Sequence, residues 1–294
     1  TRRDADQLPD AERRRTQPGD HAINQRHMLQ SYARIAVALA LALILLMPVL
    51  WLVQMSLRPA GDFLSTEFPF TPSLESYGAL WTGNFPKSFG NSLIGSTLST
   101  LLALLIGVPA AYVLERARFR YRRGIAFLIL STRMAPPIAF TIPYFLAFRY
   151  AGLHDTLTGL TLVYLSFNLA LVVWMMQTFF AQLPGALEEA ASIDGCSPWQ
   201  SFRMVALPLV APGLGATGVL CFTYSWNDFF FALILTRTHA MTAPVAIVNF
   251  MQFDGWEWGK IAAAAVMVML PVVVFTMLVR RFLVAGLTAG AVKE

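Results

Sequence analysis

Residues 35–53 read IAVALALALILLMPVLWLV, a run of nineteen residues without a charged side chain. A helix needs about 20 predominantly apolar residues to cross the hydrocarbon core of a bilayer. The run does not alternate between apolar and polar residues, as the strands of a membrane barrel do. This stretch therefore predicts a transmembrane helix.

The composition of the whole chain is also typical of a membrane protein. Of its 294 residues, 56% are hydrophobic and 13% are charged, and the mean hydropathy is +0.56. Soluble domains carry about 25% charged residues. The composition excludes a soluble enzyme, a secreted disulfide scaffold and a disordered regulator. Five more predominantly apolar stretches bring the predicted number of spans to six, in an all-α membrane fold: 91–114, 124–148, 158–180, 209–236 and 260–279.

The placement of Lys and Arg predicts the orientation of these spans, because cytoplasmic loops are enriched in basic residues. If both termini are cytoplasmic, the segments 1–34, 115–123, 181–208 and 280–294 hold 16 of the 22 basic residues. The opposite side then holds five, and Arg133 lies inside a span. We therefore expect a multi-pass protein with both termini in the cytoplasm.

The sequence divides into an N-terminal tail, residues 1–33, and a transmembrane permease domain, residues 34–294. The tail mixes Arg with Asp and Glu and has no apolar core, so it is not a signal peptide. Its composition is typical of a flexible segment. The last residues, 280–294, form a second predicted cytoplasmic tail.

Catalytic and cofactor motifs are absent from the sequence. The segment Gly255–Ile261 (GWEWGKI) resembles a phosphate-binding loop, but it has one residue too few between its glycines and no Ser or Thr after the lysine. The four histidines form no His-Glu-x-x-His pair, and two cysteines, Cys196 and Cys221, are too few for a zinc cluster. The net charge of +5 follows membrane topology and does not indicate nucleic acid. We expect no metal and no cofactor in this chain.

The most informative loop lies between the fourth and fifth predicted spans. Residues 183–212 read LPGALEEAASIDGCSPWQSFRMVALPLVAP. Ala186 to Ile193 favour a helix, which Gly195 ends because glycine adopts the left-handed conformation of many helix ends. Ser197 and Gln200 then form a capping box for a second helix, with Pro198 at its first position and Pro208 at its end. The loop therefore predicts two short helices at an angle.

This loop resembles the coupling loop of ABC importer permeases of the binding-protein-dependent class. The shared motif is Glu-Ala-Ala, then a glycine, then Leu-Pro at the family spacing, with Val205 at a position that is usually Ile. The resemblance extends from about residue 34 to the end of the chain. The matching residues of the loop, 183–208, are Glu189, Ala190, Ala191, Asp194, Gly195, Leu207 and Pro208.

Two further segments resemble one subfamily. The ending Gly286–Glu294 is similar to the tail of the second permease subunit of maltose-type sugar importers, and so is the segment Trp226–Phe229 (WNDF). The resemblance implies the type I ABC importer permease fold in a bacterial inner membrane. It also implies transport of a sugar or sugar-like solute, without naming which sugar.

The resemblance further implies the partners. They are a second permease that shares the translocation path, two ATP-binding subunits that hold ATP and Mg, and an extracytoplasmic solute-binding protein. Glu189 would contact a basic side chain of the ATP-binding subunit, and Gly195 would supply a tight turn. Ala190 and Ala191 would allow close approach, and Leu207-Pro208 would link the loop to span five. Residues 286–294 would be a second contact.

Polar residues inside the spans are candidates for the substrate path, because charges in a membrane normally face a cavity or a partner group. Arg133 fits either a pathway role or a structural ion pair. It precedes Pro136-Pro137, which we expect to break the helix. Asn168 is a weaker candidate. In span five, a polar and aromatic set at i, i+3, i+4 and i+7 predicts one helix face: Tyr224, Asn227, Asp228 and Phe231.

Two readings of this face remain open, a substrate path and a contact with the companion permease. A different class of function, an ion-gradient-driven secondary transporter, predicts inverted repeats and pairs of carboxylates in the membrane. Asp228 is the only carboxylate deep in a predicted span, and no repeat is visible. The sequence therefore favours the transport subunit that depends on separate ATP-binding partners.

Overall fold

The computed structural model describes residues 18–59, 62, 70–117, 119–134, 136–252 and 255–291. The chain divides into two units, Thr1–Leu52 and Val53–Glu294, and their boundary falls within helix α1 (Pro18–Ser56). α1 contains the apolar run 35–53 and extends back to Pro18, so residues 18–33 of the predicted tail are helical. The remainder of that tail lies outside the described residues.

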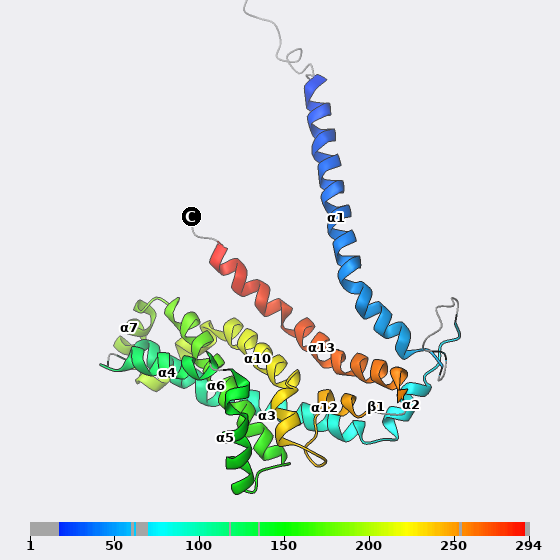
Figure 1. The fold of residues 1–294 in the computed structure, drawn as a ribbon. Helices are drawn as coiled ribbons and strands as arrows, with labels where there is room; N and C mark the ends of the chain where they lie inside the picture. The colour runs from blue at the N-terminus through cyan, green and yellow to red at the C-terminus, as the bar shows by residue number, and fades with distance from the viewer. Residues whose placement is uncertain are drawn as a thin grey trace, which may run out of the picture. The chain divides into compact units, whose positions relative to one another are not determined.

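The second unit is built almost entirely of helices (Figure 1). A two-residue antiparallel pair, β1 (Met251–Gln252) and β2 (Gly255–Trp256), precedes the last helix. The longer helices are α3 (Phe85–Arg116), α4 (Arg122–Met134), α5 (Pro137–Tyr150), α6 (Leu157–Ala181), α10 (Ala211–Trp226) and α13 (Trp258–Ala291). The shorter ones are α2 (Glu75–Trp81), α7 (Ala186–Ile193), α8 (Pro198–Ser201), the π-helix η1 (Phe202–Ala206), α9 (Leu207–Leu209), α11 (Phe230–Leu235) and α12 (Ala243–Val248).

The helices confirm the predicted membrane fold. Four are long and apolar enough to cross a bilayer: Ser31–Ser56 within α1, α3, α6 and Trp258–Met277 within α13. Two bent pairs have the composition of broken spans, α4 with α5 at 93° and Pro198–Leu209 with α10 at 77°. By length and composition, the described residues therefore provide four spans, or up to six if each bent pair is one span.

The bend between α4 and α5 confirms the predicted break in span three. α4 ends at Met134 and α5 begins at Pro137, with Pro136 in an extended conformation at its N-cap. Proline has no N–H to donate and disfavours a helical conformation in the residue before it. Pro136-Pro137 therefore stops one helix and allows the next to begin in a new direction.

The prediction of one continuous helix over residues 209–236 was wrong. α10 ends at Trp226, and α11 begins at Phe230. The carboxylate of Asp228 accepts a hydrogen bond from the backbone N–H of Ala232 at 3.1 Å, in the first turn of α11. Asn and Asp side chains compete with the backbone for such bonds and favour helix ends. The Asn227-Asp228 pair therefore accounts for the break.

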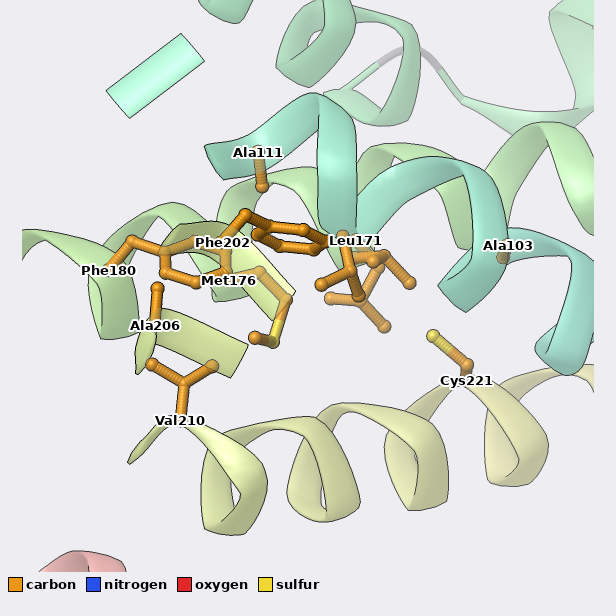
Figure 2. Packing of buried hydrophobic residues seen from close by; sticks show 11 residues of the cluster. Ala103, Ala111, Leu171, Met176, Phe180, Phe202, Ala206, Val210 and Cys221 are labelled. Carbon is orange, nitrogen blue, oxygen red and sulfur yellow. The ribbon is translucent and has the colours of Figure 1, made fainter. Parts of the chain in front are cut away.

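The core of the second unit lies where α3, α6 and α10 pack together. Figure 2 shows the rings of Phe180 and Phe202 among small side chains such as Ala111 and Ala206. Close packing depends on small residues, as is usual between membrane helices. A Cβ at Gly213 would lie 2.5 Å from the ring of Phe179, which leaves no room for a larger residue.

Candidate functional site

A pocket of about 230 Å³, lined by both polar and apolar groups, lies in the second unit, between α4–α5, α6 and the α10–α11 break. It combines two charged side chains with several aromatic rings. Its lining residues are Arg133, Pro137, Tyr164, Phe167, Asn168, Tyr224, Ser225, Asp228 and Phe231.

Arg133 enters this pocket from the last turn of α4. Its Nη1 donates a hydrogen bond to the carbonyl oxygen of Phe167 at 3.2 Å. Its guanidinium carbon lies 4.6 Å from the centroid of the Tyr224 ring, within the range of a cation–π interaction. A cation inside a span is costly unless such groups replace its hydration. Arg133 is therefore held by a carbonyl and a ring, and not by a carboxylate, in the described contacts.

Asp228 supplies the opposite charge. Its Oδ2 accepts hydrogen bonds from the hydroxyl of Tyr164 at 3.1 Å and from the N–H of Ala232 at 3.1 Å. Two donors stabilise the carboxylate at the break between α10 and α11. Asp228 thus stabilises the start of α11 and also lines the pocket.

Asn168 lies at the inner edge of the pocket and is 1% exposed. Its Nδ2 donates to the hydroxyl of Ser225 at 2.8 Å and lies 3.4 Å from the hydroxyl of Ser99. Ser99 also donates to Ser225 at 3.4 Å. These three side chains come from α6, α10 and α3, so the network ties the pocket wall to α3.

The structure brings four of the five predicted path residues together in this pocket: Arg133, Asn168, Tyr224 and Asp228. Asn227, by contrast, is exposed at the C-cap of α10 and does not line the pocket. The single helix face proposed for span five does not exist, because the helix stops at Trp226. Tyr224, Asp228 and Phe231 meet at the pocket through the break instead.

Sequence reasoning missed Tyr164 and Phe167. Tyr164, Phe167 and Asn168 are spaced i, i+3 and i+4 on α6, so they share one helix face. This i, i+3, i+4 spacing is the sequence signal for the two rings, because it places them on the same helix face as Asn168. With Tyr224 and Phe231, these residues give the pocket four aromatic side chains.

The lining suits a small polar solute with an apolar side. Binding pockets typically combine aromatic and apolar walls with a few polar groups that set orientation. Arg133 donates hydrogen bonds and Asp228 accepts them, and their charges are opposite. The pocket therefore offers a ligand aromatic faces together with hydrogen-bond donors and acceptors.

The loop 183–208 has the two-helix form predicted for it. α7 ends at Ile193 with Asp194 as its C-cap, and Gly195 has a φ of +85°. The N–H of Gly195 donates to Ser192 O at 3.1 Å, and that of Cys196 donates to Ala191 O at 2.9 Å. This pair of bonds is a Schellman motif. The capping box of Ser197 and Gln200 at the start of α8 is also present.

The second helix of this loop does not end at Pro208, which corrects our prediction. It continues through η1 into α9 and stops at Leu209. Pro208 lacks an N–H, and its ring would clash with the carbonyl of Met204 in a regular α-helix. The chain widens into a π-helix before it, where the N–H of Leu207 donates to Phe202 O.

The motif residues of the loop differ in exposure. Glu189, Ala190, Asp194, Gly195 and Pro208 are exposed. Leu207 is half-buried and Ala191 is buried at 7%. The exposed members are therefore available to a partner, whereas Ala191 packs within the chain. Among the described residues, no group of three or more His, Cys, Asp or Glu side chains is placed to hold a metal ion.

The helical membrane fold, the pocket at the α10–α11 break and the two-helix loop are the features expected of a transport permease. Residues 103–285 match the family described as binding-protein-dependent transport system inner membrane component. The chain belongs to this family. It is therefore a multi-pass inner-membrane permease subunit of an ABC importer, and not an ion-gradient-driven secondary transporter.

Individual relatives support the same assignment. The trehalose transport system permease protein SugB of Mycobacterium tuberculosis is 40% identical, over 84% of this chain and 92% of the relative. The trehalose/maltose transport system permease protein MalG of Thermococcus litoralis is 34% identical, over 92% of this chain and 99% of the relative.

A solved structure shares the fold. It belongs to a bacterial ABC transporter involved in the import of the acidic polysaccharide alginate. The two chains have a TM-score of 0.71 and 24% identity, and the match covers 86% of this chain and 96% of the other.

Proposed function

We propose that this chain is one of two membrane permeases of an ATP-driven importer for a sugar or sugar-like solute. The observation that carries the proposal is the 40% identity with a trehalose permease along 84% of this chain. The pocket is compatible with it, because Arg133 and Asp228 supply opposite charges and hydrogen-bonding groups beside aromatic rings.

In this proposal the other components supply recognition and energy. An extracytoplasmic solute-binding protein delivers the solute, and a second permease completes the translocation path. Two ATP-binding subunits hold ATP and Mg and hydrolyse the nucleotide. Binding energy at those subunits shifts the permeases between conformations that open to opposite sides.

The loop 183–208 is the proposed contact with the ATP-binding subunit. Glu189 is exposed on α7, where its charge is available to a basic side chain of that subunit. The Gly195 turn fixes the angle between α7 and α8. Residues 286–294 are the proposed second contact. Because the loop is cytoplasmic in this proposal, both termini are cytoplasmic as well.

The pocket is proposed to form part of the solute path in this subunit. Arg133, Tyr224 and Asp228 would meet hydroxyl groups and the apolar face of the solute, and Asn168 would hold the wall in place. Asn227 is now proposed to lie outside the path, since it is exposed away from the pocket lining.

The test is uptake by the purified complex. A tag on this chain is used to isolate the complex with its companion permease and ATP-binding subunits, which is then placed in vesicles with the solute-binding protein. We expect trehalose uptake that requires ATP and that methionine, as a control solute, does not show. Uptake driven by a sodium or proton gradient without ATP would refute the proposal, and so would ATP-driven uptake of methionine but not of trehalose.

A further inference from the structure

The charged residue next to Glu189 has a different role. Glu188 is half-buried, with a side chain 16% exposed, whereas Glu189 is exposed. Consecutive residues in an α-helix point about 100° apart, so the two carboxylates serve different surfaces. The surface that Glu188 serves is α3 of the same chain.

Both oxygens of Glu188 are engaged. Oε1 accepts a hydrogen bond from Arg116 Nε at 2.8 Å, and Oε2 accepts one from the Tyr112 hydroxyl at 2.9 Å. Tyr112 and Arg116 are spaced i, i+4 and therefore share one face of α3. Arg116 also donates from Nη2 to the carbonyl of Leu183 at 3.0 Å, just before α7. α3 is thus joined to α7 through Glu188 and to the segment before α7 through Leu183.

Tyr112 also contacts the second helix of the loop. The Tyr112 ring lies 4.9 Å from the Phe202 ring and 5.3 Å from the Phe180 ring, measured between centroids. Phe202 is 4% exposed and Phe180 is 0% exposed. Charge-assisted bonds to α7 and the contact of the Tyr112 ring with the buried Phe202 ring of η1 therefore attach both halves of the loop to one end of α3.

α3 also contacts the pocket wall, through Ser99. Ser99 of α3 is hydrogen-bonded to Ser225 and lies next to Asn168, and these last two residues line the pocket. Ser99 precedes Arg116 by 17 residues on one helix, which is roughly 25 Å at about 1.5 Å per residue. α3 is one continuous helix over this length, with Pro109 inside it. It is therefore a direct covalent connection along which a displacement of one end can reach the other.

We infer that Glu188, with Arg116 and Tyr112, is a positioning group that transmits movement of the loop 183–208 through α3 to the pocket. Glu189 contacts the ATP-binding subunit, and Glu188 passes that movement to the bundle. This inference rests on the proposed function. In this role Glu188 couples the nucleotide state of the ATP-binding subunits to the conformation of the pocket. Glu188 itself contacts neither the solute nor the nucleotide.

The experiment measures access to the pocket and needs no knowledge of the solute. The native cysteines are replaced by Cys196→Ser and Cys221→Ala, and Tyr224→Cys places one thiol in the pocket. The labelling rate of this thiol by a maleimide is measured on the assembled complex, with and without ATP and vanadate. The variants added to this background are Glu188→Gln and Tyr112→Phe, and Glu115→Gln is the matched control. Glu115 carries the same charge one residue from Arg116, and among the described side-chain hydrogen bonds and ion pairs it makes none with α7.

We expect ATP with vanadate to change the labelling rate in the background and in Glu115→Gln. In Glu188→Gln we expect that change to shrink roughly fivefold or more, the lower end of typical coupling between two sites. The ATP-binding subunits should remain bound and hydrolyse ATP. Tyr112→Phe removes one hydroxyl and keeps the ring, so it should show a smaller loss in the same direction even if Glu188→Gln assembles poorly.

The outcomes separate the two proposals. An unchanged ATP response in both Glu188→Gln and Tyr112→Phe would overturn the positioning role and leave the proposed function intact. An equal loss in Glu115→Gln would also overturn it, because the effect would then follow charge alone. The proposed function itself is tested by the uptake experiment on the unaltered complex, and its failure there is therefore distinguishable from failure of the positioning role.

Discussion

The hydroxyl of Tyr164 donates a hydrogen bond to the carboxylate of Asp228 at 3.1 Å, and this contact joins α6 to the break between α10 and α11. The two residues are 64 positions apart in the chain. The same carboxylate oxygen accepts the N–H of Ala232. One acid therefore holds two helices together and lines the pocket between them.

We predict that Asp228→Asn impairs trehalose uptake, while the complex assembles and hydrolyses ATP at its basal rate. The amide has the same shape, but it loses the charge, and hydrogen bonds to charged groups are worth about 1.5–3 kcal/mol. Tyr164→Phe should impair uptake in the same direction, because it removes one of the two donors. The measurements are ATP-driven uptake in vesicles and a pull-down of the companion permease.

Asn227→Ala is the matched control, since Asn227 is the adjacent polar residue and is exposed outside the pocket. It should transport normally. If Asp228→Asn releases the companion permease in detergent, Asp228 is an intersubunit contact and not a path residue. Normal uptake in both Asp228→Asn and Tyr164→Phe would contradict either role.

We predict that Gly195→Ala weakens binding of the ATP-binding subunit. Gly195 has a φ of +85°, and a Cβ there would meet nothing within 4 Å. The penalty is therefore conformational and not steric crowding, and it is about 1–2 kcal/mol for a residue other than glycine in this region. Gly195→Asn should bind better than Gly195→Ala, because Asn tolerates the left-handed conformation. Equal binding of both variants in a pull-down would show that the turn does not determine the contact.

We predict a pH-dependent tether at Asp155. Its carboxylate accepts the backbone N–H groups of residues 237–240. Burial by itself would raise the pKa of Asp155, but these donors outweigh it and hold the pKa below its ordinary value of 3.8. The stabilisation is therefore complete above that ordinary value and is lost as the pH falls through the lower, folded pKa.

Asp155→Asn tests this tether, because Asn tolerates the φ of +55° at this position. Thermal unfolding of the complex in detergent should show a lower Tm for Asp155→Asn at about pH 7, and the difference should narrow below about pH 4. A difference that does not change over this range would show that the carboxylate charge is not responsible.

We predict that residues 71 and 192 lie on opposite sides of the membrane. Thr71 and Ser192 are both exposed, and single cysteines are placed there in the Cys196→Ser, Cys221→Ala background. A membrane-impermeant maleimide should label Thr71→Cys in intact cells and Ser192→Cys only after permeabilisation, because basic residues are concentrated on the cytoplasmic side. Labelling of Ser192→Cys in intact cells would reverse the proposed orientation.

The sequence alone determined the features that depend on neighbouring residues. The uncharged run 35–53 predicts a membrane helix, and Pro136-Pro137 predicts the end of α4. Gly195 and the Ser197–Gln200 pair predict the turn and the cap of the loop, since the groups that satisfy a helix end lie within a few residues of it. The family motif occupies this same loop.

The tertiary structure decided which distant polar residues meet. Arg133 contacts the Tyr224 ring, and Asp228 contacts Tyr164, across helices whose packing no local spacing predicts. Helical spacing even misplaced Asn227, because the Asp228 side chain ends the helix that the spacing assumed. A polar group inside a membrane bundle needs a hydrogen-bond or charge partner from a neighbouring helix. Which residue becomes that partner depends on how the helices pack.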